Sequence, residues 1–145
     1  MSIHEQIAAL PVQINDSGSL KVLLITSRET RRWVTPKGWP MKDKTPWEAA
    51  EIEALEEAGV SGRVASEQLG CFHYDKVLED GSALTCKVSV YPLLVEKLHK
   101  NWKERSERTR RWFSPRGAAK AVHEDELKDL LSALSKKVLK QTVEA

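Results

Sequence analysis

Apolar residues fall into two runs near the start of the chain that predict a pair of β-strands. The runs cover residues 7–14 and 20–26, and both are rich in valine, isoleucine and leucine. Between them, residues 15–18 read Asn-Asp-Ser-Gly, a sequence typical of turns. We therefore predict a β-hairpin at the start of the fold.

An irregular basic segment follows and ends in a helix start. Residues 28–46 contain three prolines and several arginines, so we expect a loop with one short strand at Trp33-Val34. Thr45 suits an N-cap and Pro46 the first helical position, and Glu48 completes a Thr-x-x-Glu capping box. A helix should begin here.

This helix, which should end at Gly59, separates an apolar stripe from an acidic face. The positions predicted to face the core are Trp47, Ala50, Ala54, Leu55 and Ala58. Glu53, Glu56 and Glu57 share another face at i, i+3 and i+4, where like charges repel. A hard divalent cation such as Mg²⁺ would offset that repulsion. An ordinary solvated acidic face is the alternative.

The second half of the chain predicts another hairpin and two helices. Strand formers at residues 69–77 and 83–95 flank a Glu-Asp-Gly-Ser turn at 79–82, and Pro92 places the end of the second strand at an edge or bulge. Ser114-Pro115 predicts a helix start. A final amphipathic helix is indicated by apolar residues at helical spacing, namely Leu127, Leu130, Leu131, Leu134 and Val138.

The composition is that of one globular domain, residues 1–145, with 41% hydrophobic and 30% charged residues. No stretch approaches the roughly 20 apolar residues of a membrane span, and the first residues lack signal-peptide features, so we expect a cytoplasmic protein. The two cysteines and four histidines are too scattered for a disulfide framework or a zinc site. A net charge of +2 gives no argument for nucleic-acid binding.

The segment around the acidic helix resembles the Nudix box. That pattern is Gly, five residues, Glu, seven residues, Arg-Glu, an aliphatic residue, any residue, Glu-Glu, any residue, Gly and an aliphatic residue. Gly38 and Gly59 fall on its two glycines, and Glu53, Glu56 and Glu57 fall on its helical glutamates. Within the family, the chain is most similar to the diphosphoinositol polyphosphate and diadenosine polyphosphate hydrolases, over nearly its whole length.

This resemblance implies an α/β protein with the Nudix-type α/β/α sandwich, a mixed β-sheet and a loop-helix-loop active site. It implies a hydrolase of phosphoanhydride bonds with Mg²⁺ or Mn²⁺ as cofactor. Glu53 and Glu57 would be the main metal ligands and catalytic residues, assisted by Glu56. The main-chain carbonyl of Lys37 would be a further ligand. The general base stays open between Glu53 and a residue outside the box.

Two positions depart from the box. Lys44 stands where the family usually has Glu, and Ile52 where it has Arg. An arginine at position 52 would lie beside Glu56 and help to orient and neutralise the acidic cluster, which isoleucine cannot do. The second hypothesis is therefore a catalytically weakened Nudix module that binds a phosphorylated ligand.

Basic residues on both sides of the box indicate a small-molecule polyphosphate substrate. The resemblance matches Ser27, Arg28 and the basic run ending at Arg110 to phosphate-contacting positions. The candidate substrate-binding residues are Ser27, Arg28, Arg32, Lys37, Gly38, Trp39, Arg108 and Arg110. The candidate substrates are a nucleoside diphosphate derivative, a diadenosine polyphosphate and a diphosphoinositol polyphosphate. Residues 7–14 argue against the last, because they carry no lysine or arginine where proteins of that group commonly have a basic strand.

Several aromatic residues allow structural or functional interpretations. Trp39 could stack on a base or pack against its own domain. We interpret Trp33 and Trp112 as core residues. His73 and Tyr74 could reach the pocket, but we interpret them as plain strand residues. A third hypothesis, an RNA-binding module, draws on the basic residues at 103–111 and the tryptophans. The sequence leaves open whether the protein is a monomer or a homodimer.

Overall fold

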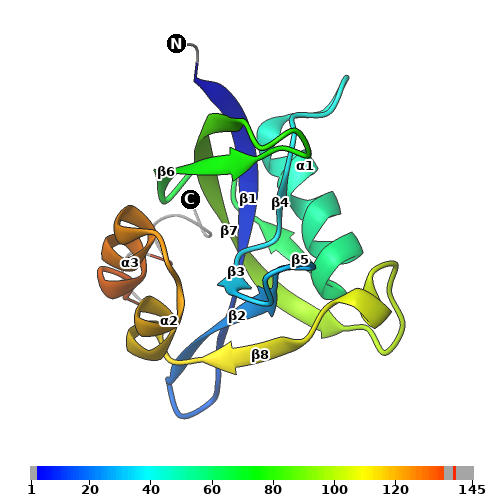
Figure 1. Cartoon of the computed structure of the whole chain (residues 1–145). Coiled ribbons are helices and arrows are strands. Elements are labelled where there is room, and N and C mark those ends of the chain that lie inside the picture. The colour runs from blue at the N-terminus through cyan, green and yellow to red at the C-terminus, as the bar shows by residue number, and fades with distance from the viewer. Residues whose placement is uncertain (1–2, 136–138, 140–145) are drawn as a thin grey trace.

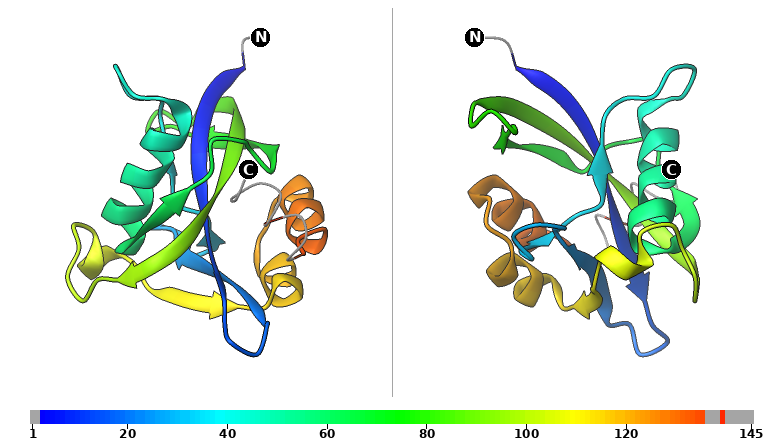
Figure 2. Two further views of the ribbon diagram at one scale, coloured as in Figure 1. Left: turned by 180° about the vertical axis from the view of Figure 1, so that it is seen from behind. Right: turned by 45° about the vertical axis from the view of Figure 1, so that its right-hand side comes forward.

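A mixed β-sheet with helices on both faces forms the centre of the computed structural model, which describes residues 3–135 and 139 (Figure 1). The elements in chain order are β1 (His4–Ile14), β2 (Leu20–Thr26), β3 (Trp33–Val34), β4 (Lys37–Gly38), α1 (Pro46–Glu53), the π-helical turn η1 (Ala54–Ala58), β5 (Val60–Val64), β6 (Gly70–Val77), β7 (Ala83–Leu98), the 3-10 turn η2 (Arg105–Glu107), β8 (Arg110–Phe113), α2 (Pro115–Ala121) and α3 (Asp125–Ser132). Helix α1 lies on one side of the sheet, and α2 and α3 lie on the other (Figure 2). The predicted α/β/α sandwich is confirmed.

The sheet is built around β1 and β7, which run parallel to each other. Its main path is β3-β2-β1-β7-β5, while β4 pairs with β1, β6 with β7 and β8 with β2. The two predicted hairpins are present as the antiparallel pairs β1-β2 and β6-β7. Strands β4 and β5 were not predicted from the sequence. Each is short and relies on the long central strands for its pairing.

Alternate residues of the central strands face opposite apolar layers. In β1, Leu10 packs in the layer that includes α2 and α3, while Ala9 packs in the layer that includes α1. Strand β7 alternates in the same way, with Val90 in the first layer and Leu93 in the second. These strands are buried on both faces, so their sequences are continuous apolar runs.

We expected Pro92 to place the end of its strand at an edge or bulge. Strand β7 continues past Pro92 to Leu98, and its pairing with β5 has a register shift opposite Val95 and Lys97. On one side, β6 pairs with β7 as far as Val90, and β5 takes over from Leu93. Pro92 lies at this change of partner, where a residue without an N–H is tolerated inside a long strand.

The predicted helix start at Ser114-Pro115 is confirmed, and helix α3 is shorter than expected. Ser114 caps α2 by accepting a hydrogen bond from the Gly117 N–H at 3.0 Å. Leu127 and Leu131 of α3 are fully buried, as predicted, but α3 ends at Ser132. Val138, which we placed on the same helix, lies outside the described residues. No helix within the described part of the chain has the length and apolar character to cross a membrane.

Candidate active site

Helix α1 has the predicted capping box at its start. The Thr45 hydroxyl accepts a hydrogen bond from the Glu48 N–H at 3.2 Å, and the Glu48 carboxylate accepts one from the Thr45 N–H at 2.9 Å. The helix continues into η1 and ends at Gly59, whose φ of 67° is left-handed. A Cβ at Gly59 would also lie 2.5 Å from the Trp102 ring, so both conformation and space require glycine.

Most of the predicted apolar stripe on this helix is correct, but Leu55 is not part of it. Leu55 is 42% exposed, whereas Ala50, Ala54 and Ala58 are fully buried, and Ala49 adds a buried position that we had not predicted. A π-helical turn begins at Ala54, and Leu55 lies within it. Small side chains let the helix lie close to β1.

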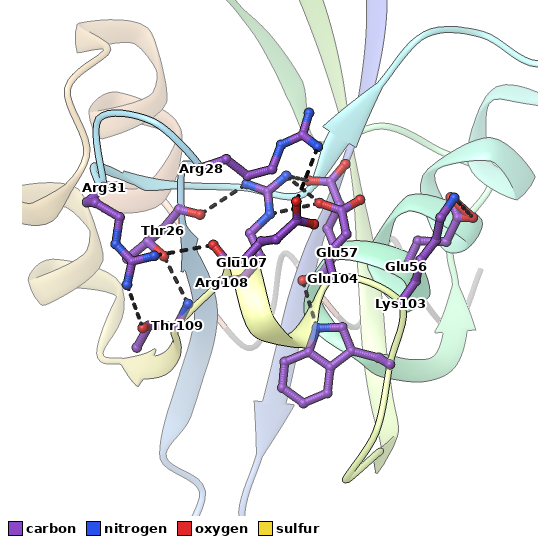
Figure 3. Close-up of polar contacts among 11 residues, drawn as sticks. Thr26, Arg28, Arg31, Glu56, Glu57, Lys103, Glu104, Glu107, Arg108 and Thr109 are labelled. Carbon is purple, nitrogen blue, oxygen red and sulfur yellow. Dashed lines mark hydrogen bonds and ion pairs between the residues drawn. The ribbon is translucent and has the colours of Figure 1, made fainter.

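The acidic face of the helix brings two carboxyl groups into direct contact. Glu57 is only 6% exposed and shares a hydrogen bond with Glu53. The Glu53 carboxylate lies against Gly38 of β4, where a Cβ would come within 2.6 Å of it. Glu56 points to a more open place and contacts the Lys103 ammonium at 3.4 Å (Figure 3).

Burial is the main reason why the pKa of the Glu57 carboxyl is raised. The hydrogen bond and charge of Glu53 raise this pKa further, while the Arg108 guanidinium at 3.4 Å opposes the shift. Without another cation, the Glu57 carboxyl held against Glu53 therefore gives up its proton less readily than a solvated carboxyl does. A pair of this kind is suited to exchanging its proton for a metal ion.

The donor set fits a hard divalent cation such as Mg²⁺ or Mn²⁺. Glu53, Glu56 and Glu57 supply carboxylate oxygens, and the Lys37-Gly38 peptide lies next to the Glu53 carboxylate. Within the described ranges, no three His, Cys, Asp or Glu side chains are already arranged as a metal-binding group.

These carboxylates line a cavity of about 600 Å³. All of the predicted substrate-binding residues except Arg110 line the same cavity, namely Ser27, Arg28, Arg32, Lys37, Gly38, Trp39 and Arg108. They come from the β2-β3 loop, from β4 and the residue after it, and from the segment before β8. The fold thus places cations on more than one side of the acidic face.

Comparison with known proteins identifies the family. The model of the NUDIX domain matches residues 4–134. This chain belongs to the Nudix family. Nudix hydrolase 12, mitochondrial, of Arabidopsis thaliana is 36% identical over 102 residues, which make up 68% of this chain and 50% of that protein. Diphosphoinositol polyphosphate phosphohydrolase 3-beta of Homo sapiens is 33% identical over 105 residues, 70% of this chain and 60% of that protein.

The chain therefore spans about half the length of the first curated relative that it matches. Among solved structures, a crystal structure of C. elegans Ap4A hydrolase superposes with a TM-score of 0.64 at 17% identity. The match covers 90% of this chain and 95% of that one, and shows a shared Nudix fold.

Arg110 does not face the cavity of this Nudix domain, so our expectation that it contacts substrate does not fit its position. Its guanidinium donates hydrogen bonds to the carbonyls of Ala58, Gly59 and His99, at 2.9, 3.2 and 2.8 Å. It also lies 4.0 Å from the centre of the Trp102 ring. Arg110 supports the end of the box helix.

Lys37 extends into the cavity beneath Tyr74. Its ammonium lies 4.9 Å from the centre of the Tyr74 ring. Burial lowers the pKa of Lys37, and the nearby charges of Glu57 and Glu124 oppose that change. Tyr74 in turn donates a hydrogen bond from its hydroxyl to Gln6 at 2.6 Å.

Sequence reasoning missed several residues of the cavity wall. Tyr74, which we interpreted as a plain strand residue, lines the cavity, whereas its neighbour His73 turns away and contacts Glu126. The other missed wall residues include Gln6, Asp75, Lys76 and Glu104. The period of two along β6 could have indicated that alternate residues such as Tyr74 and Lys76 share a face. Trp33 packs against Phe113 and Trp112 against the α1 layer, as expected for core residues.

Proposed function

We propose that this Nudix domain is a metal-dependent pyrophosphohydrolase that cleaves a phosphoanhydride bond in a nucleoside diphosphate derivative or a diadenosine polyphosphate. The observation that carries the proposal is the buried Glu57 carboxyl held against Glu53. Two acidic groups are kept together in a cavity that also contains arginine and lysine. This arrangement favours a ligand that brings both metal cations and phosphate anions.

Each part of the cavity has a role in this reaction. Glu53, Glu56 and Glu57, with the Lys37 carbonyl, would hold Mg²⁺ or Mn²⁺, which when bound polarises phosphoryl oxygens and lowers the pKa of a coordinated water. Arg28 and Arg32 would neutralise and orient the phosphates. A carboxylate must accept the proton of the attacking water. Glu53 is one candidate, and Glu104, outside the box, is another because it lines the cavity.

The charge of the cavity wall favours a short phosphate chain. Five cationic side chains line it, from Arg28, Arg32, Lys37, Lys76 and Arg108. Six acidic side chains line it as well, from Glu29, Glu53, Glu56, Glu57, Asp75 and Glu104. Because acidic and cationic side chains are nearly equal in number, the wall does not match an inositol ring that carries many phosphates. Trp39 and Val77, which are 43% and 72% exposed, offer apolar surface for a nucleobase at the rim.

The test is product release from a substrate panel with Mg²⁺ and with Mn²⁺. The panel contains nucleoside diphosphate derivatives, diadenosine polyphosphates and diphosphoinositol polyphosphates. We expect turnover of a nucleotide class that Glu57→Gln abolishes without unfolding the protein. Glu51→Gln is the matched control, because Glu51 is exposed on the same helix and does not line the cavity. Wild-type turnover by Glu57→Gln would show that the metal assignment is wrong.

The second candidate function is a binding module without turnover, and Ile52 is the observation that favours it. Such a module would be stabilised against heat by a phosphorylated ligand and release no product. Efficient turnover of any member of the panel would exclude it. We do not propose RNA binding, because Trp102 and Arg110 are engaged with the box helix.

A further inference from the structure

One distant segment, residues 102–110, supports the end of the box helix. The Trp102 indole N–H donates a hydrogen bond to the Glu57 carbonyl at 3.1 Å, and the Glu104 N–H donates one to the Glu56 carbonyl at 3.0 Å. Arg110 bonds the carbonyls of Ala58 and Gly59. Carbonyls at the end of a helix have no partner within the helix, so these contacts from outside fix the turn that carries the acidic residues.

The same segment supplies cations to the acidic side chains (Figure 3). Lys103 contacts Glu56 at 3.4 Å, and Arg108 contacts Glu57 at 3.4 Å. The Lys103 side chain is 69% exposed, so its pair is screened by solvent. The side chains of Arg108 and Glu57 are only 9% and 8% exposed, so their contact acts in a poorly solvated place.

Arg108 has most of its hydrogen-bonding capacity committed to the protein. Its Nε and Nη2 both donate to the Glu104 carboxylate, at 3.0 and 2.9 Å, and Nη1 donates to the Thr26 carbonyl at 3.0 Å. A second bond from Nη2 reaches Glu57. A guanidinium has five N–H donors in a rigid fork, and here that fork is fixed on three sides. Its geometry is suited to holding Glu57 in one orientation.

The box helix itself offers no such donor. Ile52 stands where the pattern has arginine, and an aliphatic side chain can neither neutralise nor orient a carboxylate. Within the described ranges, the box carboxylates form ion pairs with Lys103 and Arg108, both of which lie about 50 residues later in the chain.

We propose that Arg108 is a positioning residue that holds Glu57 for metal binding and so gives the acidic cluster the orienting arginine that the box lacks at position 52. The inference rests on the proposed function, because it assigns Arg108 a role through Glu57 and the metal. It differs from a phosphate-binding role for Arg108. A phosphate contact would affect the KM for substrate, whereas a positioning contact affects metal affinity and kcat.

Arg108→Lys is the decisive variant, because it keeps the charge and removes the fork. Isothermal titration of the metal-free protein with Mn²⁺ measures affinity without substrate. We expect the affinity to fall by about tenfold or more, the usual effect of losing a residue that orients a metal ligand. At saturating metal, kcat should fall while KM stays the same. The matched control is Arg105→Lys, in the same segment, where the guanidinium contacts Asn101 rather than the acidic helix.

Restoring the box arginine tests whether Arg108 replaces it. Adding Ile52→Arg to the Arg108→Lys variant should recover Mn²⁺ affinity and kcat, whereas Ile52→Arg in the wild type should change neither. An unchanged Mn²⁺ affinity in folded Arg108→Lys, or no recovery in the double variant, would overturn the inference. A gain of about tenfold in Mn²⁺ affinity from Ile52→Arg alone would also overturn it. If thermal unfolding shows that Arg108→Lys does not fold, the Mn²⁺ affinity of Ile52→Arg alone still tests the role of Arg108.

These outcomes separate the inference from the function on which it rests. A wild-type protein that neither binds Mn²⁺ nor hydrolyses any member of the panel would end the proposed function itself. If the wild type binds Mn²⁺ and hydrolyses a substrate, and Arg108→Lys behaves identically, only the proposed role of Arg108 is excluded.

Discussion

The two glycines of the Nudix box are required for different physical reasons. Gly59 has a left-handed backbone and lies against Trp102. Gly38 has no such backbone, but a Cβ there would lie 2.6 Å from the Glu53 Cδ and 2.8 Å from its carboxylate oxygens. The absence of a side chain at Gly38 thus defines where the Glu53 carboxylate can lie.

Gly38→Ala should therefore act mainly on catalysis. The new methyl group displaces the Glu53 carboxylate, and a shift of about 1 Å at a catalytic group can cost roughly 100-fold in rate. We expect kcat to fall by about that factor, with a small change in melting temperature. Gly70→Ala is the control, since its Cβ would meet only the end of Leu130 at 3.2 Å. Equal kcat values for the two variants would contradict this view of Gly38.

The site residues that sequence reasoning identified correctly are those whose positions follow from local spacing. Glu53, Glu56 and Glu57 line one cavity because they share a helical face. Arg110 could not be placed in this way. Its contacts with Ala58 and Gly59 join residues 52 and 51 positions apart, and only the paired sheet brings them together. From the sequence, Arg108 and Arg110 look equivalent.

At the scale of the element, the two ends of the box helix differ in how far the sequence predicts them. The start depends on a capping box spanning four consecutive residues, so Thr45 and Glu48 predict it fully. The end contains a π-helical turn, which has no local signature here. That turn depends on hydrogen bonds from Trp102 and Glu104, which the sequence cannot place next to it.

Removing the capping box should lower stability without changing the chemistry. Thr45→Ala loses the N-cap hydrogen bond, and we expect the free energy of unfolding to fall by about 1 kcal/mol. The active-site end of the helix lies more than two turns away, so kcat should stay near the wild-type value. Urea unfolding and steady-state kinetics measure the two quantities. A large loss of kcat with unchanged stability would contradict the prediction.

The contribution of Glu48, the acidic residue of the capping box, to the free energy of unfolding depends on pH. Hydrogen bonds from Thr45 hold the pKa of the Glu48 carboxyl below its ordinary value. Because the folded-state pKa is the lower one, the contribution of Glu48 to stability is present above about pH 4.3, the ordinary carboxyl pKa. It is lost as the pH falls through the lowered pKa. The stability difference between the wild type and Glu48→Gln should therefore shrink in acid.

For the whole molecule, the sheet separates two apolar layers that have different tasks. The layer on one face includes Ala50 and Ala54 and supports the box helix. The layer on the other face includes Leu127 and Leu131 from α3. Continuous apolar runs in the sequence predicted the central strands, but not which of their residues face each layer. That assignment depends on the register of β1 against β7.

Leu131→Ala tests how independent the two layers are. Leu131 is fully buried, and its truncation should lower the free energy of unfolding by about 2–5 kcal/mol. Since the acidic helix packs on the opposite face, kcat/KM should remain close to the wild-type value at temperatures where the variant is folded. Denaturant unfolding and kinetics at low temperature provide the comparison. A proportional loss of activity in fully folded protein would show that the layers are coupled.

The support of the box helix by residues 102–110 also has a consequence for the order of events during protein synthesis. The indole of Trp102 and the carbonyl that it binds on Glu57 are 45 residues apart in the chain. A nascent chain that has left the ribosome as far as β6 already exposes all three glutamates, but the residues that fix their turn have yet to emerge. The chain should thus become able to bind metal late, once β8 has paired with β2. A ribosome-bound chain stalled before Trp102 should bind Mn²⁺ poorly.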